Sequence, residues 1–211
     1  LSQGAWPAKP INYLVAFPAG GTTDILARLV SQKLGTALGT SIVIENKGGA
    51  GGSVGSEVAA RAPADGYHLL GGTISSHAIN VSLYPKLGYD PIKSFTPVYM
   101  YGTNPVVLVV AANSPYKTLR DLLTAAKANP GKSRWGAANP ASLERIGMEK
   151  LARAANVKVP IVSHEGGGDM MIGVLNGTYD IGIGEIQELQ GQLEAGKVRL
   201  LATLSEKRLT G

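Results

Sequence analysis

The sequence contains no cysteine, which excludes disulfides, thiolate metal sites and cysteine nucleophiles from this chain. No apolar run approaches the roughly 20 residues that a membrane-spanning helix needs. Lysine and arginine give a net charge of +5, but they are scattered singly, without the basic runs and interleaved aromatic residues of nucleic-acid grooves. We therefore expect no membrane-spanning segment and no nucleic-acid partner.

The residues that are present give the composition of an ordinary globular protein, with 44% hydrophobic and 17% charged residues. A chain of 211 residues can bury a sizeable core, as one large domain or two small ones. The mild positive charge suits an anionic ligand, although a solvated surface explains it equally well.

Short apolar runs alternate with helical patterns along the chain. The first cycle has a strand over residues 11–16, a Pro/Gly turn and a helix with Thr22, Thr23 and Asp24 as capping residues. Because parallel strands need a crossover, this alternation predicts βαβ units in an α/β fold. Further strands are expected at 41–45, 67–72, 98–111, 133–137, 160–164, 180–184 and 198–205, and further helices at 54–62, 119–128, 142–155, 168–175 and 187–194.

The pattern is interrupted at Gly102-Thr103-Asn104-Pro105, and the cycle then starts again. We therefore expect two α/β lobes, residues 1–103 and 104–204, each a mostly parallel sheet flanked by helices.

Glycine-rich turns follow strands and precede helices in both lobes, at the sheet edge where α/β proteins usually bind ligands. In Phe17-Pro18-Ala19-Gly20-Gly21, backbone N–H groups and the positive end of the following helix form a natural anion site. The alternative is a tight turn without a ligand. Because similar turns recur at 48–52, 137–142 and 165–168, a ligand cleft is favoured over idle loops.

A catalytic alternative is the run Gly51-Gly52-Ser53-Val54-Gly55, which satisfies the G-x-S-x-G pattern of a serine hydrolase. Asp121 and His164 could complete a triad on chain order. Against this, residues 46–50 separate Ser53 from the preceding strand. The three histidines share no metal-ligand spacing, so we expect neither a metal nor a cofactor.

A set of ordered motifs, taken together, resembles the tripartite tricarboxylate transporter receptor family, the Bug/TctC-type periplasmic solute-binding proteins. The motifs are Trp6-Pro7 with Pro10-Ile11, Phe17 to Asp24, Glu45 to Gly52, Ala62 to Tyr67, His77 to Asn80, Tyr89-Asp90-Pro91, Phe95 to Val98, and Ala195 to Arg199.

The resemblance implies a two-lobed periplasmic-binding-protein fold of type II-like organisation, a Venus flytrap, with a small carboxylate bound between the lobes. It implies a non-enzymatic, monomeric, periplasmic receptor that delivers its ligand to the membrane permease of a tripartite transporter. A receptor that signals through a sensor protein is the alternative. By position, the ligand-binding residues are Phe17, Ala19, Gly20, Gly21, Thr22, Thr73, Ser75 and His77 in the first lobe, and Ala138, Asn139, Ser142, Arg145, His164, Gly166 and Glu185 in the second.

Some second-lobe residues depart from the family pattern. Val162-Ser163-His164 replaces Val-Pro-Tyr, and Asn139-Pro140 replaces glycines, so the identity of the ligand does not transfer. Arg145 stands where a histidine is common; it either pairs with a second carboxylate of a diacid or is an exposed helical arginine.

The two ends of the chain carry expectations of their own. Residues 1–7 lack the charged and apolar regions of a signal peptide, so we expect a mature form from which the signal has been removed. In the family that the motifs resemble, the chain continues past this point with a segment that crosses back and completes the first lobe. Residues 205–211 are expected to begin this crossover, and the first lobe is expected to be incomplete without the remainder of the segment.

Overall fold

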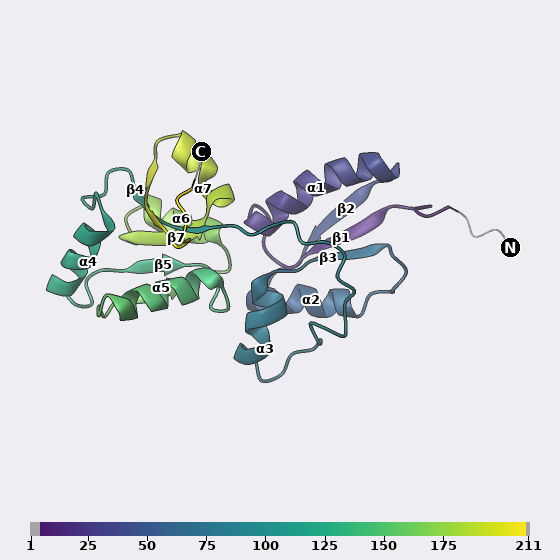
Figure 1. Ribbon diagram of the computed structural model, residues 1–211, viewed down its shortest axis with the longest axis horizontal. Coiled ribbons are helices and arrows are strands. Elements are labelled where there is room, and N and C mark those ends of the chain that lie inside the picture. Colours follow the sequence, from purple (N-terminus) through teal and green to yellow (C-terminus); the bar gives the residue numbers. More distant parts are fainter. Residues whose placement is uncertain (1–4, 210–211) are drawn as a thin grey trace. The chain divides into compact units, whose positions relative to one another are not determined.

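The computed structural model describes residues 5–209, which divide into two compact units at Val98/Tyr99. Each unit is an α/β assembly (Figure 1), and the predicted α/β fold class is confirmed. The unit of residues up to Val98 is called unit 1, and the unit from Tyr99 onward is called unit 2.

Unit 1 is built on a three-stranded parallel sheet in the order β2-β1-β3. Its helices α1 and α2 cover opposite faces of this sheet (Figure 1), because the crossover from β1 to β2 and the crossover from β2 to β3 run in opposite directions. The elements are β1 (Ile11–Val15), α1 (Thr22–Leu38), β2 (Ile42–Asn46), a 3₁₀ turn (Ala50–Gly52), α2 (Ser53–Ala60), β3 (His68–Gly71), a π-helical turn (Ser75–Ile79) and α3 (Asn80–Leu83).

Unit 2 has a five-stranded sheet in the order β6-β5-β7-β4-β8. Strand β4 runs antiparallel to both of its neighbours, and the other four strands share one direction. The elements are β4 (Val106–Ala111), α4 (Leu119–Ala128), β5 (Trp135–Ala137), α5 (Leu143–Ala154), β6 (Ile161–Ser163), α6 (Gly167–Leu175), β7 (Ile181–Glu185), α7 (Ile186–Glu194) and β8 (Val198–Thr203).

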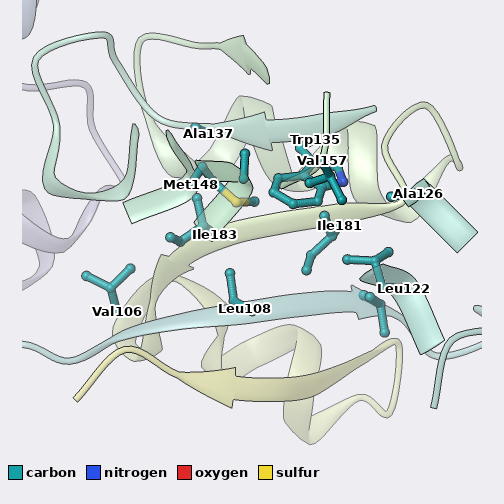
Figure 2. Packing of buried hydrophobic residues seen from close by; sticks show 12 residues of the cluster. Val106, Leu108, Leu122, Ala126, Trp135, Ala137, Met148, Val157, Ile181 and Ile183 are labelled. Atoms are coloured by element: carbon teal, nitrogen blue, oxygen red, sulfur yellow. The ribbon is translucent and has the colours of Figure 1, made fainter. Parts of the chain in front are cut away.

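The apolar run of β4 is buried on both faces of the unit 2 sheet. Val106, Leu108 and Val110 pack into the cluster with Leu122 of α4 and Met148 of α5 (Figure 2), while Val107 and Val109 pack against residues of α6 and α7. Since successive side chains of a strand point to opposite faces, an unbroken apolar run is the pattern of a strand covered on both sides.

The sequence pattern failed over two segments. Residues 98–101, which precede the predicted interruption at 102–105, carry no strand, and extended pairing begins only at Val106. Residues 75–83, for which no helix was predicted, are helical. This stretch is rich in serine and β-branched residues, which are weak helix formers, and its conformation depends on contacts such as the one from Asn80 to the carbonyl oxygen of Gly51 (2.9 Å).

Candidate functional site

The predicted residues of unit 1 follow two adjacent parallel strands. Phe17 to Thr22 come after β1, and Thr73, Ser75 and His77 come after β3. The carboxyl ends of parallel neighbours meet at one sheet edge, which brings the two loops together. Gly52 lies between them, because a Cβ on this glycine would stand 2.8 Å from the Phe17 ring and 3.3 Å from Cβ of Ser76.

The turn after β1 ends at Gly21, which is the N-cap of α1 with extended φ/ψ of −75° and 166°. The prediction that Thr22, Thr23 and Asp24 cap this helix is therefore wrong in detail, since Thr22 is already helical. Gly20 adopts a φ of +85°, in the region that favours glycine. The turn thus places the N-terminal end of α1, where backbone N–H groups point out of the helix, at the sheet edge.

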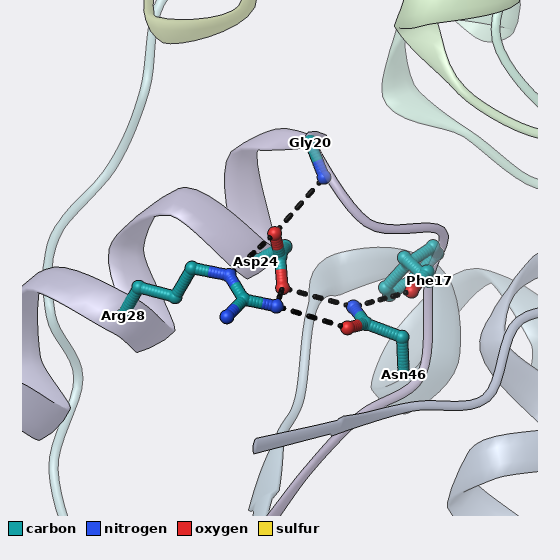
Figure 3. A network of polar contacts seen from close by, with 5 residues as sticks. All are labelled: Phe17, Gly20, Asp24, Arg28 and Asn46. Atoms are coloured by element: carbon teal, nitrogen blue, oxygen red, sulfur yellow. Dashed lines mark hydrogen bonds and ion pairs between the residues drawn. The ribbon is translucent and has the colours of Figure 1, made fainter.

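Asp24 holds this turn in place from inside the first helical turn (Figure 3). Its carboxylate accepts hydrogen bonds from the Gly20 N–H (2.9 Å), from Arg28 (2.9 and 3.0 Å) and from the Asn46 amide (2.9 Å). The same Asn46 amide donates to the carbonyl oxygen of Phe17 (3.2 Å). Burial by itself raises the pKa of Asp24, but the hydrogen bonds from Arg28, Gly20 and Asn46 outweigh it and lower the pKa below its ordinary value.

This network determines what the turn can offer to a ligand. The Gly20 N–H is already used by Asp24, so an anion at the turn must find its donors elsewhere in the segment. The positive charge of Arg28 compensates the Asp24 carboxylate at the start of α1. The positive end of the helix dipole therefore remains favourable for an anion.

The loop after β3 is ordered by a serine. Oγ of Ser76 accepts the Thr73 N–H (3.1 Å) and lies 2.8 Å from Nδ1 of His77. The His77 ring packs against Phe95 at 5.0 Å between centroids, in a cluster that includes Tyr89. Burial lowers the pKa of His77, which disfavours the charged form of the ring. His77 is thus held in place by protein contacts.

Ser53 is the first residue of α2, after a 3₁₀ turn that separates it from β2. Its Oγ accepts a hydrogen bond from Asn80 (2.8 Å). Asp121 and His164, which could complete a triad on chain order, do not pair with each other in unit 2. The Asp121 carboxylate accepts the Thr118 N–H at the start of α4 (2.8 Å), and His164 contacts Tyr179. The geometry therefore gives no support to a serine nucleophile.

The predicted residues of unit 2 follow β5, β6 and β7, whose carboxyl ends form one edge. After β5, Ala138 and Asn139 are buried, and Oγ of Ser142 caps α5 by accepting the Arg145 N–H (3.0 Å). His164 comes directly after β6, followed by Gly166 as the N-cap of α6. Glu185 ends β7 and is the N-cap of α7.

Arg145 is not the freely exposed helical arginine considered from the sequence, and its pairing with a second carboxylate of a diacid stays a prediction. Its guanidinium donates to Glu149 (2.7 and 3.1 Å), to the carbonyl oxygen of Ile161 (3.0 Å) and to Oγ of Ser163 (2.9 Å). The side chain is 28% exposed. Arg145 therefore braces α5 against β6, and most of its donors are already used.

Sequence reasoning missed four residues that shape these loops: Asp24 as a clamp, Asn46, Asn80 and Tyr179. Asp24, Asn46 and Asn80 each belong to one of the family motifs given above, and this membership is the only feature of the sequence that could have pointed to them. Tyr179 lies outside those motifs. Within residues 5–209, no three His, Cys, Asp or Glu side chains are grouped so as to hold a metal ion. Over the same range, no helix has both the length and the apolar character needed to cross a bilayer.

Residues 26–211 match a family profile described as "Tripartite tricarboxylate transporter family receptor". The curated relatives that the chain matches are longer, and the chain spans 60–65% of their lengths.

Among the solved structures that share the fold at more than 25% identity, three are named by their ligand or family. The chain is 33% identical to "R. palustris Rpa4515 with adipate", with a TM-score of 0.93, covering 97% of this chain and 68% of that one. It is 30% identical to "MatC (Rpa3494) from Rhodopseudomonas palustris with bound malate", with a TM-score of 0.86, covering 96% and 69%. It is 31% identical to "periplasmic binding protein BugD", with a TM-score of 0.83, covering 96% and 68%. The resemblance stated from the sequence motifs is confirmed.

Proposed function

Because the chain belongs to the tripartite tricarboxylate transporter receptor family, we propose that it is a periplasmic receptor that binds a small organic carboxylate and transforms nothing. The relatives with adipate and with malate support this ligand class. Delivery of the ligand to a membrane permease belongs to the same proposal, and the description of the family as transporter receptors supports it. That the receptor acts as a monomer is part of the proposal as well.

The observation that carries the proposal is the turn from Phe17 to Gly21. It leads directly into a helix of 17 residues, and the carboxylate of Asp24 beside it is paired with Arg28 and accepts a hydrogen bond from Asn46. A carboxylate at this turn gains charge-assisted hydrogen bonds from backbone N–H groups. We propose that the loops after β5, β6 and β7 add contacts that select the ligand, through Asn139, Ser142, His164, Gly166 and Glu185. The braced guanidinium of Arg145 does not favour it as a partner for a second carboxylate.

The test is calorimetry of the 211-residue chain with adipate, malate, glutamate and benzoate, and with adipamide as the uncharged control. We expect at least one carboxylate to bind with 1:1 stoichiometry and adipamide to bind at least about 10-fold more weakly, because it lacks the charge. Binding of none of the four acids, or equal binding of adipate and adipamide, would overturn the proposal.

A matched pair of variants locates the site. Ala19 and Ala64 are both exposed, in different loops of unit 1. Ala19→Asp places a negative charge in the turn and should weaken carboxylate binding by at least about 10-fold through like-charge repulsion. Ala64→Asp makes the same change of net charge away from the turn and should leave affinity within about 2-fold. Equal losses would move the site away from the turn.

A further inference from the structure

The histidine that follows β6 is held by a buried tyrosine. Nε2 of His164 lies 2.7 Å from the Tyr179 hydroxyl, and the two rings meet edge to face with centroids 5.4 Å apart. The His164 N–H also donates to the carbonyl oxygen of Ala137 (3.1 Å). Backbone and ring are therefore both anchored at the carboxyl edge of the sheet, among the loops proposed to select the ligand.

Tyr179 itself has little freedom to move. It is 8% exposed, and its N–H donates to the carbonyl oxygen of Gly173 (2.9 Å). Its ring occupies space left by two glycines, since a Cβ would stand 2.7 Å from the ring at Gly136 and 2.3 Å from it at Gly173. The packing of the ring thus fixes the position of the hydroxyl beside the His164 imidazole.

The direction of this hydrogen bond follows from the available acceptors. Within residues 5–209, the only partner of the Tyr179 hydroxyl is Nε2 of His164. If Nε2 carried the proton and donated, the tyrosine proton would have no acceptor in a largely buried place. The missing hydrogen bond would disfavour the Nε2–H tautomer by about tenfold or more. The hydroxyl therefore donates, and Nε2 accepts.

A neutral imidazole with an accepting Nε2 carries its proton on Nδ1. In the part of the chain described, Nδ1 of His164 has no hydrogen-bond partner. The open side of the ring thus presents a donor. A carboxylate accepts hydrogen bonds only, so this tautomer attracts it, whereas the other tautomer would face it with a lone pair.

We propose that Tyr179 is a positioning residue that holds His164 in the Nδ1–H tautomer, so that this N–H donates to a carboxylate oxygen of the ligand. The inference rests on the proposed function for the identity of the ligand. It goes beyond that function in two ways: it assigns a role to Tyr179, which does not contact the ligand, and it specifies the tautomer in which His164 binds.

Other ionisable groups lie close to His164 or Tyr179 along the chain or contact residues beside them, and they are the same in all the variants compared below. Glu165 is its neighbour in the chain, Arg145 donates to the adjacent Ser163, and Asp169 lies in the first turn of α6. The side chain of Asp180, next to Tyr179, accepts the Arg134 N–H, and the Glu188 carboxylate lies against Gly167. A difference between wild type and a Tyr179 variant therefore reports on the tyrosine hydroxyl.

The first experiment needs no ligand. Long-range ¹H–¹⁵N spectra at pH 7.5 should show Nδ1 of His164 protonated and Nε2 unprotonated in the wild type. Tyr179→Phe keeps the buried ring and should shift the population toward the Nε2–H form, while Tyr116→Phe removes a hydroxyl elsewhere in unit 2 and should change nothing. A wild type with Nε2 protonated would overturn the proposal, as would an unchanged spectrum in Tyr179→Phe.

The second experiment is calorimetry with adipate at pH 7.5. Tyr179→Phe should weaken binding about 5–10-fold, because the ring then presents the lone pair of Nδ1 to the carboxylate in a larger share of molecules. In a His164→Ala background, Tyr179→Phe should have no further effect on affinity. A loss of the same size in the His164→Ala background would mean that Tyr179 acts only through folding.

The two experiments separate the failures. If the wild type binds adipate and Tyr179→Phe binds it equally well, this inference fails and the proposed function stands. If none of the four acids binds to the wild type, the proposed function fails, the ligand part of the inference fails with it, and the tautomer assignment is still decided by the spectra.

Discussion

At the level of single residues, the Asp24 carboxylate sets the shape of the turn after β1. It is 3% exposed and accepts from Gly20, Arg28 and Asn46, so its loss would leave several donors without an acceptor. We expect Asp24→Asn to lower the free energy of unfolding at pH 7 by about 2 kcal/mol, measured by urea denaturation. Glu45→Gln, which removes an exposed carboxylate paired with Lys47 at 3.5 Å, should cost less than about 0.5 kcal/mol.

The lowered pKa of Asp24 also predicts how stability depends on pH. A carboxylate whose pKa is depressed by folding stabilises the folded state above its unfolded value of about 3.9, and this stabilisation is lost as pH falls through the folded value. Stability should therefore decline below about pH 4 in the wild type and more gently in Asp24→Asn. Parallel curves for the two proteins would contradict the assignment.

His77 predicts a second pH effect at higher pH. Burial lowers its pKa, so below about pH 6.5 the unfolded chain takes up a proton that the folded ring resists. Stability should thus fall between pH 7 and pH 5, by on the order of 2 °C in the thermal midpoint. His77→Phe keeps an aromatic ring beside Phe95 and Tyr89 and should remove this part of the pH dependence. An unchanged slope would mean that other groups cause it.

At the level of elements, the packing of α2 on β1 depends on Gly55. A Cβ there would stand 2.6 Å from the Lys47 carbonyl oxygen and 2.8 Å from Cα of Ala16, and backbone cannot move aside as a flexible side chain can. We expect Gly55→Ala to lower the free energy of unfolding by about 2 kcal/mol or more. The last glycine of the G-x-S-x-G pattern is thus explained by helix packing.

A glycine in another helix provides the matched control. Gly191 lies within α7, and a Cβ there would meet nothing within 4 Å. Gly191→Ala should therefore raise stability by about 0.5–1 kcal/mol, because alanine loses less backbone entropy in a helix. If chemical denaturation gave both alanine variants the same sign, the role assigned to close packing at Gly55 would be wrong.

At the level of the whole molecule, the two units differ in how their sheets are buried. Strand β4 lies inside a five-stranded sheet, with side chains in clusters on both faces, whereas the buried cluster of unit 1 centres on Tyr13, Val15 and Ala27. Amides of β4 should therefore exchange hydrogen at least about 10-fold more slowly than those of β1 in native-state exchange. Equal protection of β1 and β4 would show that burial within each unit does not set local stability.

The sequence by itself determined the α/β class, the order of nearly all strands and helices, and the position of the glycine turns at sheet edges. These features depend on local periodicity and on the geometry of parallel strands, which neighbouring residues encode. The family motifs added the class of protein.

Only the tertiary structure decided which polar groups remain available for a ligand. Arg145 is bound by Ser163, the Gly20 N–H by Asp24, and Nε2 of His164 by the Tyr179 hydroxyl. The partners of Arg145 and His164 lie 18 and 15 positions away, and Asn46 reaches Asp24 across 22. Periodicity and propensity describe contacts within an element, so they carry no information about pairs that form only when separate elements pack together.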